Sequence, residues 1–138
     1  MADAKKIIKL LISKGPASFI ASVDPEGYPN MKAMLPPRKV VGIKTFYFTT
    51  TTSSLRVAHF RNNQKSSVYF CDQQHYVGVM LRGTMEVLED PKVKEMLWQE
   101  SDTAYYKGGV SDPDYCVLKF TAETGRLYQD LRSIDFPV

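Results

Sequence analysis

FYFTTTTSSLRVAHF, from Phe46 to Phe60, carries three aromatic residues into four threonines, two serines and an arginine. The β-branched and aromatic content of TFYFTT (45–50) predicts a strand. LRVAHFRNN (55–63) predicts a short helix capped by Ser53 or Ser54. Such a junction brings together backbone N–H groups, side-chain hydroxyls and the positive end of a helix dipole. It is therefore suited to binding phosphate.

Arg56 falls in the first turn of the predicted helix, where the helix dipole disfavours a cation unless an anion lies close by. No acidic residue occurs between Glu26 and Asp72, whereas seven basic residues do. A bound phosphate would supply the missing anion. The residues that would hold it are Lys32, Thr49, Thr50, Ser54 and Arg56. The run by itself also fits a polar loop with a helix cap and with Arg56 in solvent.

The sequence around this run predicts an antiparallel sheet with short helices. The predicted helices are 3–14, stopped by Gly15 and Pro16, 55–63 with Leu55, Ala58 and His59 facing inward, and 90–100. The predicted strands are 17–23, 28–35, 45–50, 66–72, 76–89 with a bend near Gly83, 116–124, and 126–133 beyond a break at Gly125. Residues 40–44 are predicted to form a short basic connection. We expect one domain over 1–138, an α+β fold that is mainly β and forms a small barrel.

Composition limits the possible functions. The 138 residues are 43% hydrophobic and 24% charged, which is typical of a soluble globular domain. No apolar run approaches the roughly 20 residues that cross a bilayer, and we expect a cytoplasmic protein with no membrane partner. The net charge of +3 is too small to indicate a nucleic-acid partner. Cys71 and Cys116 follow no metal spacing and are expected to be buried, reduced thiols.

Hydrolytic and metal chemistry are not expected. No GxSxG nucleophile elbow occurs in the sequence. His59 lies far in sequence from His75 and Cys71, so the clustered ligands of a metal site are missing. No side chain stands out as an acid or a base. This pattern suits chemistry in which a cofactor transfers the electrons and the protein positions it.

Four segments in this order resemble the FMN-binding split-barrel superfamily of pyridoxamine 5′-phosphate oxidase, specifically its short branch similar to general stress protein 26. They are FIASVDPEGYPNMKAM (19–34), FYFTTTTSSLR (46–56), YVGVMLRGTMEVLEDPKVKEMLW (76–98) and YYKGGVSDPDYCVLKF (105–120). Residues 19–34 are similar to the family's hairpin, whose second strand carries a basic residue along the flavin. Residues 46–56 resemble its aromatic–threonine strand end followed by a Ser-x-Arg phosphate clamp. Together the segments cover nearly the whole chain and imply an antiparallel split β-barrel.

The resemblance also implies a cofactor site. FMN is the implied cofactor, with its phosphate and ribityl end held by Lys32, Thr49, Thr50, Ser54 and Arg56, and with Thr51 as an addition. Backbone groups of Ala33 and Met34, with Phe48 nearby, are implied to flank the isoalloxazine ring. The family places this site at a homodimer interface. Trp98 is the candidate contact from the second subunit, although it also fits a core tryptophan of its own helix.

Two departures from the family pattern bear on activity. True pyridoxamine phosphate oxidases carry an Arg-x-Glu-Phe-Trp type segment near their end, whereas this sequence ends RLYQDLRSIDFPV. Pro36 and Pro37 stand where the oxidases have a second basic residue. Oxidation of pyridoxamine phosphate is therefore not expected. The resemblance leaves an FMN-dependent oxidoreductase acting on an unidentified small molecule, or a non-catalytic module that stores or senses flavin or binds F420 or haem.

Overall fold

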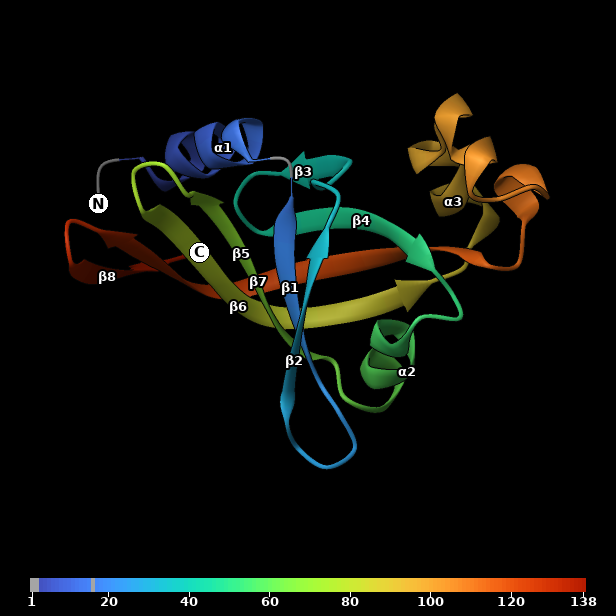
Figure 1. The fold of residues 1–138 in the computed structure, drawn as a ribbon, viewed down its shortest axis with the longest axis horizontal. Helices are drawn as coiled ribbons and strands as arrows, with labels where there is room; N and C mark the ends of the chain where they lie inside the picture. Colours follow the sequence, from blue (N-terminus) through green and yellow to red (C-terminus); the bar gives the residue numbers. More distant parts are fainter. Residues whose placement is uncertain (1–2, 16) are drawn as a thin grey trace.

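The computed structural model describes residues 3–15 and 17–138, which form a strongly curved antiparallel sheet with short helices (Figure 1). The helices are α1 (Ala4–Lys14), α2 (Leu55–Asn62) and α3 (Pro91–Leu97), with 3₁₀ turns η1 (Glu100–Ala104) and η2 (Gly109–Ser111). The strands are β1 (Ser18–Val23), β2 (Pro29–Met34), β3 (Lys39–Val41), β4 (Thr45–Thr51), β5 (Lys65–Asp72), β6 (Val77–Leu88), β7 (Tyr115–Gln129) and β8 (Arg132–Pro137). The stop signal predicted at Pro16 lies outside the described residues.

The strands form an open sheet. Their order is β2-β1-β5-β6-β7-β4-β3, with β8 paired to β7, and every pairing is antiparallel. The two end strands of this order, β2 and β3, do not pair with each other within the described part of the chain. The sheet therefore curls without closing, which confirms the predicted mainly β, split-barrel fold.

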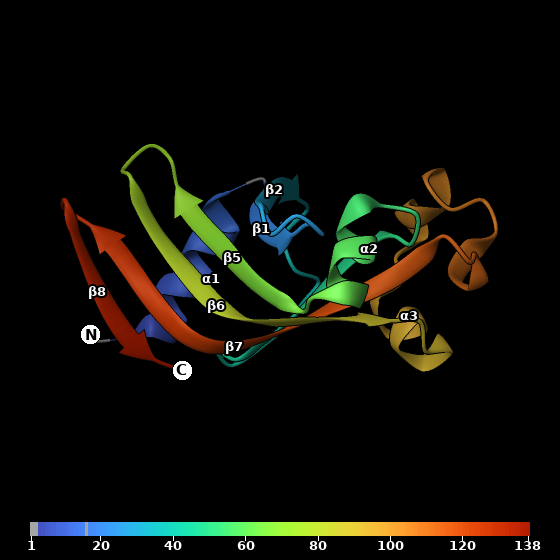
Figure 2. The same cartoon turned by 90° about the horizontal axis from the view of Figure 1, so that it is seen from below.

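The core fills the inside of this curl. Alternate residues of β4 are buried, as expected for a strand with one face on the core, and Phe46, Phe48 and Phe120 are at most 1% exposed. α1 packs against β5 and β6 through Ile8 and Leu11. Figure 2 shows the bend of β5, β6 and β7 that wraps the sheet around this core. None of the described helices has the length and apolar character needed to span a bilayer.

The bend predicted near Gly83 is present as a β-bulge between Arg82 and Gly83. A Cβ atom on Gly83 would lie 2.0 Å from the Thr121 carbonyl oxygen of β7. Glycine therefore allows two backbones to approach closely at the bend.

Several sequence predictions were wrong. Residues 39–41 form the short edge strand β3 instead of a connection, because their backbone pairs with β4 although their side chains are exposed. β7 runs unbroken through Gly125. The glycine makes room for the ring of Phe136, which occupies the place that a Cβ atom would take, and it does not end the strand. The turn instead lies at Asp130 and Leu131, where φ is 52° and 60°.

The inward face of α2 also differs from the prediction. Leu55 is 73% exposed and Ala58 is exposed, whereas His59 is buried as predicted. Val57 and Phe60 are each 1% exposed and fill the core position that the prediction had given to Leu55 and Ala58. α3 ends at Leu97, three residues before the predicted end.

The two cysteines are free thiols that differ in burial. Cys116 is buried as predicted, but Cys71 is only half-buried because its side chain lies on the outer face of β5.

Candidate functional site

The junction between β4 and α2 gathers the polar side chains of the opening motif. Ser54 is the N-cap of α2, and its hydroxyl oxygen accepts a hydrogen bond of 3.4 Å from the Val57 amide. Arg56 lies in the first turn and donates from Nη2 to Thr50 Oγ1 at 3.2 Å. Thr50, Ser54 and Arg56 therefore meet where the strand ends and the helix begins.

The charge of Arg56 is not balanced at this junction. Its Nε atom is buried and has no acceptor among the described residues. Burial lowers the pKa of the guanidinium, and the neighbouring titratable groups are Cys116 and Tyr106. Burial raises the pKa of Tyr106 to about 12 and also raises that of the Cys116 thiol, so neither is an anion at neutral pH. The structure thus holds a half-buried cation and supplies no counter-ion from the residues that it describes.

Asp114 holds the loop of this junction, a role that the sequence analysis missed. Its carbonyl oxygen accepts from the Thr52 amide at 2.8 Å, and its Oδ1 accepts from the Ser53 amide at 2.9 Å. These two loop N–H groups are therefore already engaged and cannot donate to a phosphate. The Arg56 side chain and the amides of Leu55 and Arg56, which have no acceptor among the described residues, remain as the donors. Asp114 lies in the stretch 105–120 that carries part of the family resemblance, and this was the sequence signal that could have found it.

Strand geometry separates the predicted residues of β4 into two sets. Phe48 and Thr50 face inward and are buried, whereas Thr49 and Thr51 are half-buried on the opposite face. Only Thr50 of the three predicted threonines therefore points toward Arg56. Phe48 is 1% exposed, so its ring packs in the core.

The residues predicted on β2 lie on the exposed edge strand. Lys32 pairs with Ile20 of β1, and Ala33 pairs with Phe19. Lys32 is therefore on the face of the β1–β2 hairpin that carries Ser22, whose hydroxyl lies 2.8 Å from His59 Nδ1 in α2. This is the face against which the helix of Arg56 packs.

The other two predicted ring neighbours differ in exposure and position. Met34 is buried at the end of β2, and Ala33 is exposed on the opposite face.

Trp98, which follows α3, is half-buried in its own chain against Tyr106 and Tyr115, with ring centroids 6.3 and 5.1 Å away. Its predicted contact across a dimer interface stays a prediction.

A second arginine anchors the segment that contains Asp114. Arg38 forms a two-pronged ion pair with Asp102 of η1, with distances of 2.5 and 2.6 Å, and also donates to the Leu97 carbonyl oxygen at 2.9 Å. The bonds to Arg38 hold the pKa of the Asp102 carboxyl below its usual value. This ion pair fixes the segment that lies beyond the ends of β4 and β7 in Figure 1.

An apolar hollow of about 430 Å³ opens on the outer face of the sheet. It is lined by Phe19, Ala21, Met31, Ser67, Val68, Tyr69, Met80 and Tyr128. Met31 is 74% exposed at its edge. Within the described residues there is no cluster of three or more histidine, cysteine or carboxylate side chains that would bind a metal ion.

Comparison with known proteins gives the family. Residues 4–129 match the sequence family described as pyridoxamine 5′-phosphate oxidase. A crystal structure from Clostridium acetobutylicum, of a protein related to general stress protein 26 of Bacillus subtilis, is 38% identical. The match covers 97% of this chain and 96% of that one, with a TM-score of 0.87. A search among curated proteins gave no match.

More distant structures share the fold. General stress protein 26 from Bacillus anthracis is 18% identical over 96% of this chain and 98% of that one, with a TM-score of 0.75. A heme binding protein from Mycobacterium smegmatis is 13% identical over 99% of this chain and 59% of that one, with a TM-score of 0.76. Since the family match spans most of the sequence, this chain belongs to the pyridoxamine 5′-phosphate oxidase family, in the branch related to general stress protein 26.

Proposed function

We propose that the junction between β4 and α2 binds the phosphate of FMN and that the protein is a flavoprotein. The observation that carries this proposal is Arg56, a half-buried cation whose Nε has no acceptor in the described part of the chain. An unsatisfied buried donor costs about 1–3 kcal/mol, and more for a charged group. A phosphate oxygen at this point would accept from Nε and neutralise the guanidinium. The residues present thus fit the phosphate end of the cofactor.

Other residues of the chain would complete the site. The dipole and free N–H groups of the first turn of α2 favour an anion beside Arg56. Lys32, exposed on the neighbouring hairpin, adds a second positive charge on the same face. Thr50 orients the guanidinium through its hydroxyl. Thr49 and Thr51 face away, so any contact that they make with the cofactor would come from their backbone groups.

A homodimer is part of this proposal. The apolar hollow beside Met31 leaves Tyr69, Met80 and Tyr128 on an open sheet face. A second copy covering this face would bury apolar area, as stable dimers do. The flavin ring would then lie between the subunits and be shielded from water.

We assign an oxidoreductase activity on a small molecule as the finer proposal. When bound, FMN supplies the capacity to accept and donate electrons, and the protein binds and orients it. The second candidate is a non-catalytic module for flavin, F420 or haem, favoured by the structural match to a heme binding protein. Pyridoxamine phosphate is not proposed as the substrate. The cytoplasmic location expected from the sequence stays a prediction.

Titration of the purified protein with FMN, riboflavin, F420 and haemin tests the proposal. Arg56→Ala removes a charge-assisted contact of roughly 1.5–3 kcal/mol, so FMN should bind more than tenfold more weakly. Riboflavin has no phosphate, and its affinity should hardly change.

Arg61→Ala is the matched control. Arg61 lies in the last turn of the same helix and pairs at the surface with Glu89 at 3.1 Å. This variant should bind FMN like the wild type. An equal loss of FMN and riboflavin binding in Arg56→Ala would show that Arg56 matters for folding instead. Binding of F420 or haemin without FMN binding would overturn the cofactor assignment, and a bound flavin that no reductant or oxidant can reach would favour the non-catalytic module.

A further inference from the structure

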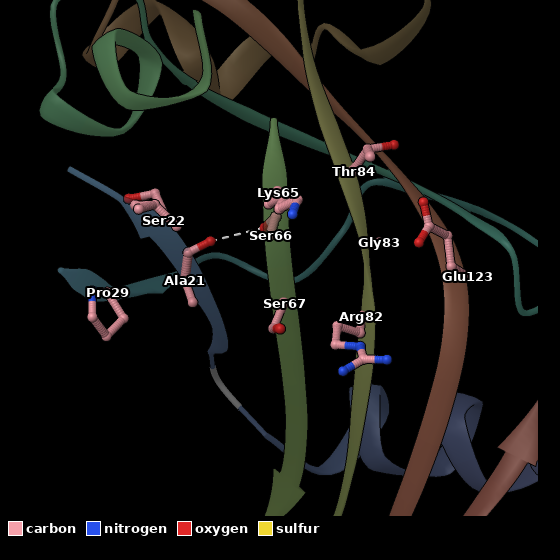
Figure 3. Close-up of a pocket in the computed structure, with 11 residues that line it drawn as sticks. Ala21, Ser22, Pro29, Lys65, Ser66, Ser67, Arg82, Gly83, Thr84 and Glu123 are labelled. Carbon is pink, nitrogen blue, oxygen red and sulfur yellow. Dashed lines mark hydrogen bonds between the residues drawn. The ribbon is translucent and has the colours of Figure 1, made fainter. Parts of the chain in front are cut away.

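A second cavity lies where strands β1 and β5 separate. These strands pair only over Phe19–Ala21 and Ser67–Tyr69. Beyond this point the hydroxyl of Ser66 donates to the Ala21 carbonyl oxygen at 2.8 Å, and no further backbone pairing of the two strands follows in the described residues. Figure 3 shows β1 diverging from β5 at this bond. The gap forms a cavity of about 480 Å³, which is large enough for a small organic molecule.

Three charged side chains from neighbouring strands line this cavity. Lys65 comes from β5, Arg82 from β6 and Glu123 from β7 (Figure 3). The bulge at Arg82 shifts the register of β6 against β7 between the pairs Arg82–Thr124 and Gly83–Ala122, so Glu123 has no direct partner on β6. None of the three charges forms an ion pair with another residue in the described part of the chain. All three are thus available to a ligand.

The other lining residues define the rest of the ligand. The hydroxyls of Ser67 and Thr84 are hydrogen-bonding groups beside the cations. Ala21, Val23 and Pro29 form an apolar wall on the opposite side. Two cations and one carboxylate give the cavity one net positive charge, which a single anionic group would neutralise. A second negative charge would meet Glu123.

We infer that this cavity is a binding site for a small organic acid that carries one carboxylate and an apolar body. Arg82 and Lys65 hold the carboxylate, because guanidinium and ammonium groups are the donors suited to it. Ala21, Val23 and Pro29 contact the apolar body. Glu123 selects against dianions. Arg56 does not line this cavity, so the inference stands apart from the proposed phosphate site, although Ala21 and Ser67 also line the apolar hollow that a second subunit is proposed to cover.

The test uses benzoate as the probe, with benzamide as its neutral counterpart and terephthalate as its dianion. Titration of the full-length, isotope-labelled protein is followed by two-dimensional amide NMR. Benzoate should shift the amides of Ser67, Gly83 and Thr84, and benzamide should bind at least about fivefold more weakly. Arg82→Gln should weaken benzoate about fivefold, as expected for an exposed ion pair. Glu123→Gln should strengthen terephthalate relative to benzoate.

Arg132→Gln is the matched control. It removes the same charge from β8, where Arg132 is exposed and does not line this cavity, and should leave benzoate binding unchanged. The NMR spectrum of each variant reports whether it is folded, and Glu123→Gln gives a reading that is independent of Arg82. Equal shifts by benzamide and benzoate, or shifts confined to residues around Arg56, would overturn the inference. FMN binding is measured on separate samples, so a failure of the proposed FMN site can be distinguished from a failure of this inference.

Discussion

Two arginines of the interval between Glu26 and Asp72, which contains no acidic residue, differ in whether the fold gives their guanidinium groups a partner. Arg38 is 11% exposed and both of its terminal nitrogens bond to Asp102, whose side chain is 5% exposed. Arg56 is half-buried and its Nε bonds to nothing in the described chain. The bonds to Asp102 raise the pKa of Arg38, whereas burial lowers that of Arg56. Arg38 has its hydrogen-bond partners within the fold, whereas Arg56 keeps an unpaired buried donor, which is the observation behind the proposed phosphate site.

The largest expected effect comes from breaking the satisfied pair. Asp102→Ala leaves the Arg38 guanidinium buried without its partner and also removes the acceptor of the Gln99 amide. Removing one partner of a buried ion pair costs about 3–5 kcal/mol. We expect the free energy of unfolding, measured by urea titration, to fall by about that amount.

Asp135→Ala is the control for that measurement. Its partner Arg126 is 39% exposed and Asp135 itself is 75% exposed. Exposed ion pairs contribute about 0–1 kcal/mol. A loss in Asp102→Ala no larger than this would mean that Arg38 does not anchor the fold, and the contrast with Arg56 would disappear.

A smaller effect of opposite sign is expected at Arg56. Arg56→Met keeps an unbranched side chain and removes a buried charge that has no counter-ion in the described chain. We expect the free energy of unfolding of the ligand-free protein to rise by about 1 kcal/mol. The reason is that a buried charged donor without an acceptor destabilises the folded state. Urea titration of the ligand-free protein measures it.

Arg38→Met is the mirror of that variant. It should lower stability, since it leaves the Asp102 carboxylate buried without its cation. Destabilisation of both variants by similar amounts would show that Arg56 also has a structural partner and would weaken the case for a phosphate site.

The sequence predicted the Arg56 half of this comparison because its causes are local. A strand end, a serine cap, an arginine in the first helical turn and the lack of nearby acids all fall within a short stretch. The Ser54 cap and the burial of His59 follow from the same neighbourhood. The split barrel was predicted from the order of longer motifs, each with its own strand and turn signals.

The Arg38 half was beyond sequence reasoning because its causes are distant. Asp102 lies 64 residues away, and only the folded sheet brings η1 beside the connection after β2. The same limit explains Gly125, which has the sequence signal of a break but makes room for Phe136 from β8. It also explains the wrong prediction for Leu55, because the packing of α2 against the sheet decides which of its residues are buried. Each of these errors arose because a local signal was interpreted without the contact between segments that decides it.

The smallest expected effect is a pH dependence that separates the two arginines again. The pKa of Asp102 is lowered from its ordinary 3.8, first of all by the hydrogen bonds of Arg38. The folded form therefore binds the proton less readily than the unfolded form, and the stability from Asp102 is present above about pH 4 and lost as the pH falls through the folded pKa. The stability difference between wild type and Asp102→Ala should stay constant from about pH 7 to 5 and shrink below about pH 4. Other carboxylates with lowered pKa values, such as Asp72, cancel because both proteins contain them. Arg56 stays charged throughout this range, so the gain from Arg56→Met should not change with pH. A gain that varies between about pH 7 and 3 would reveal a carboxylate near Arg56 and would contradict the unbalanced charge on which the phosphate site rests.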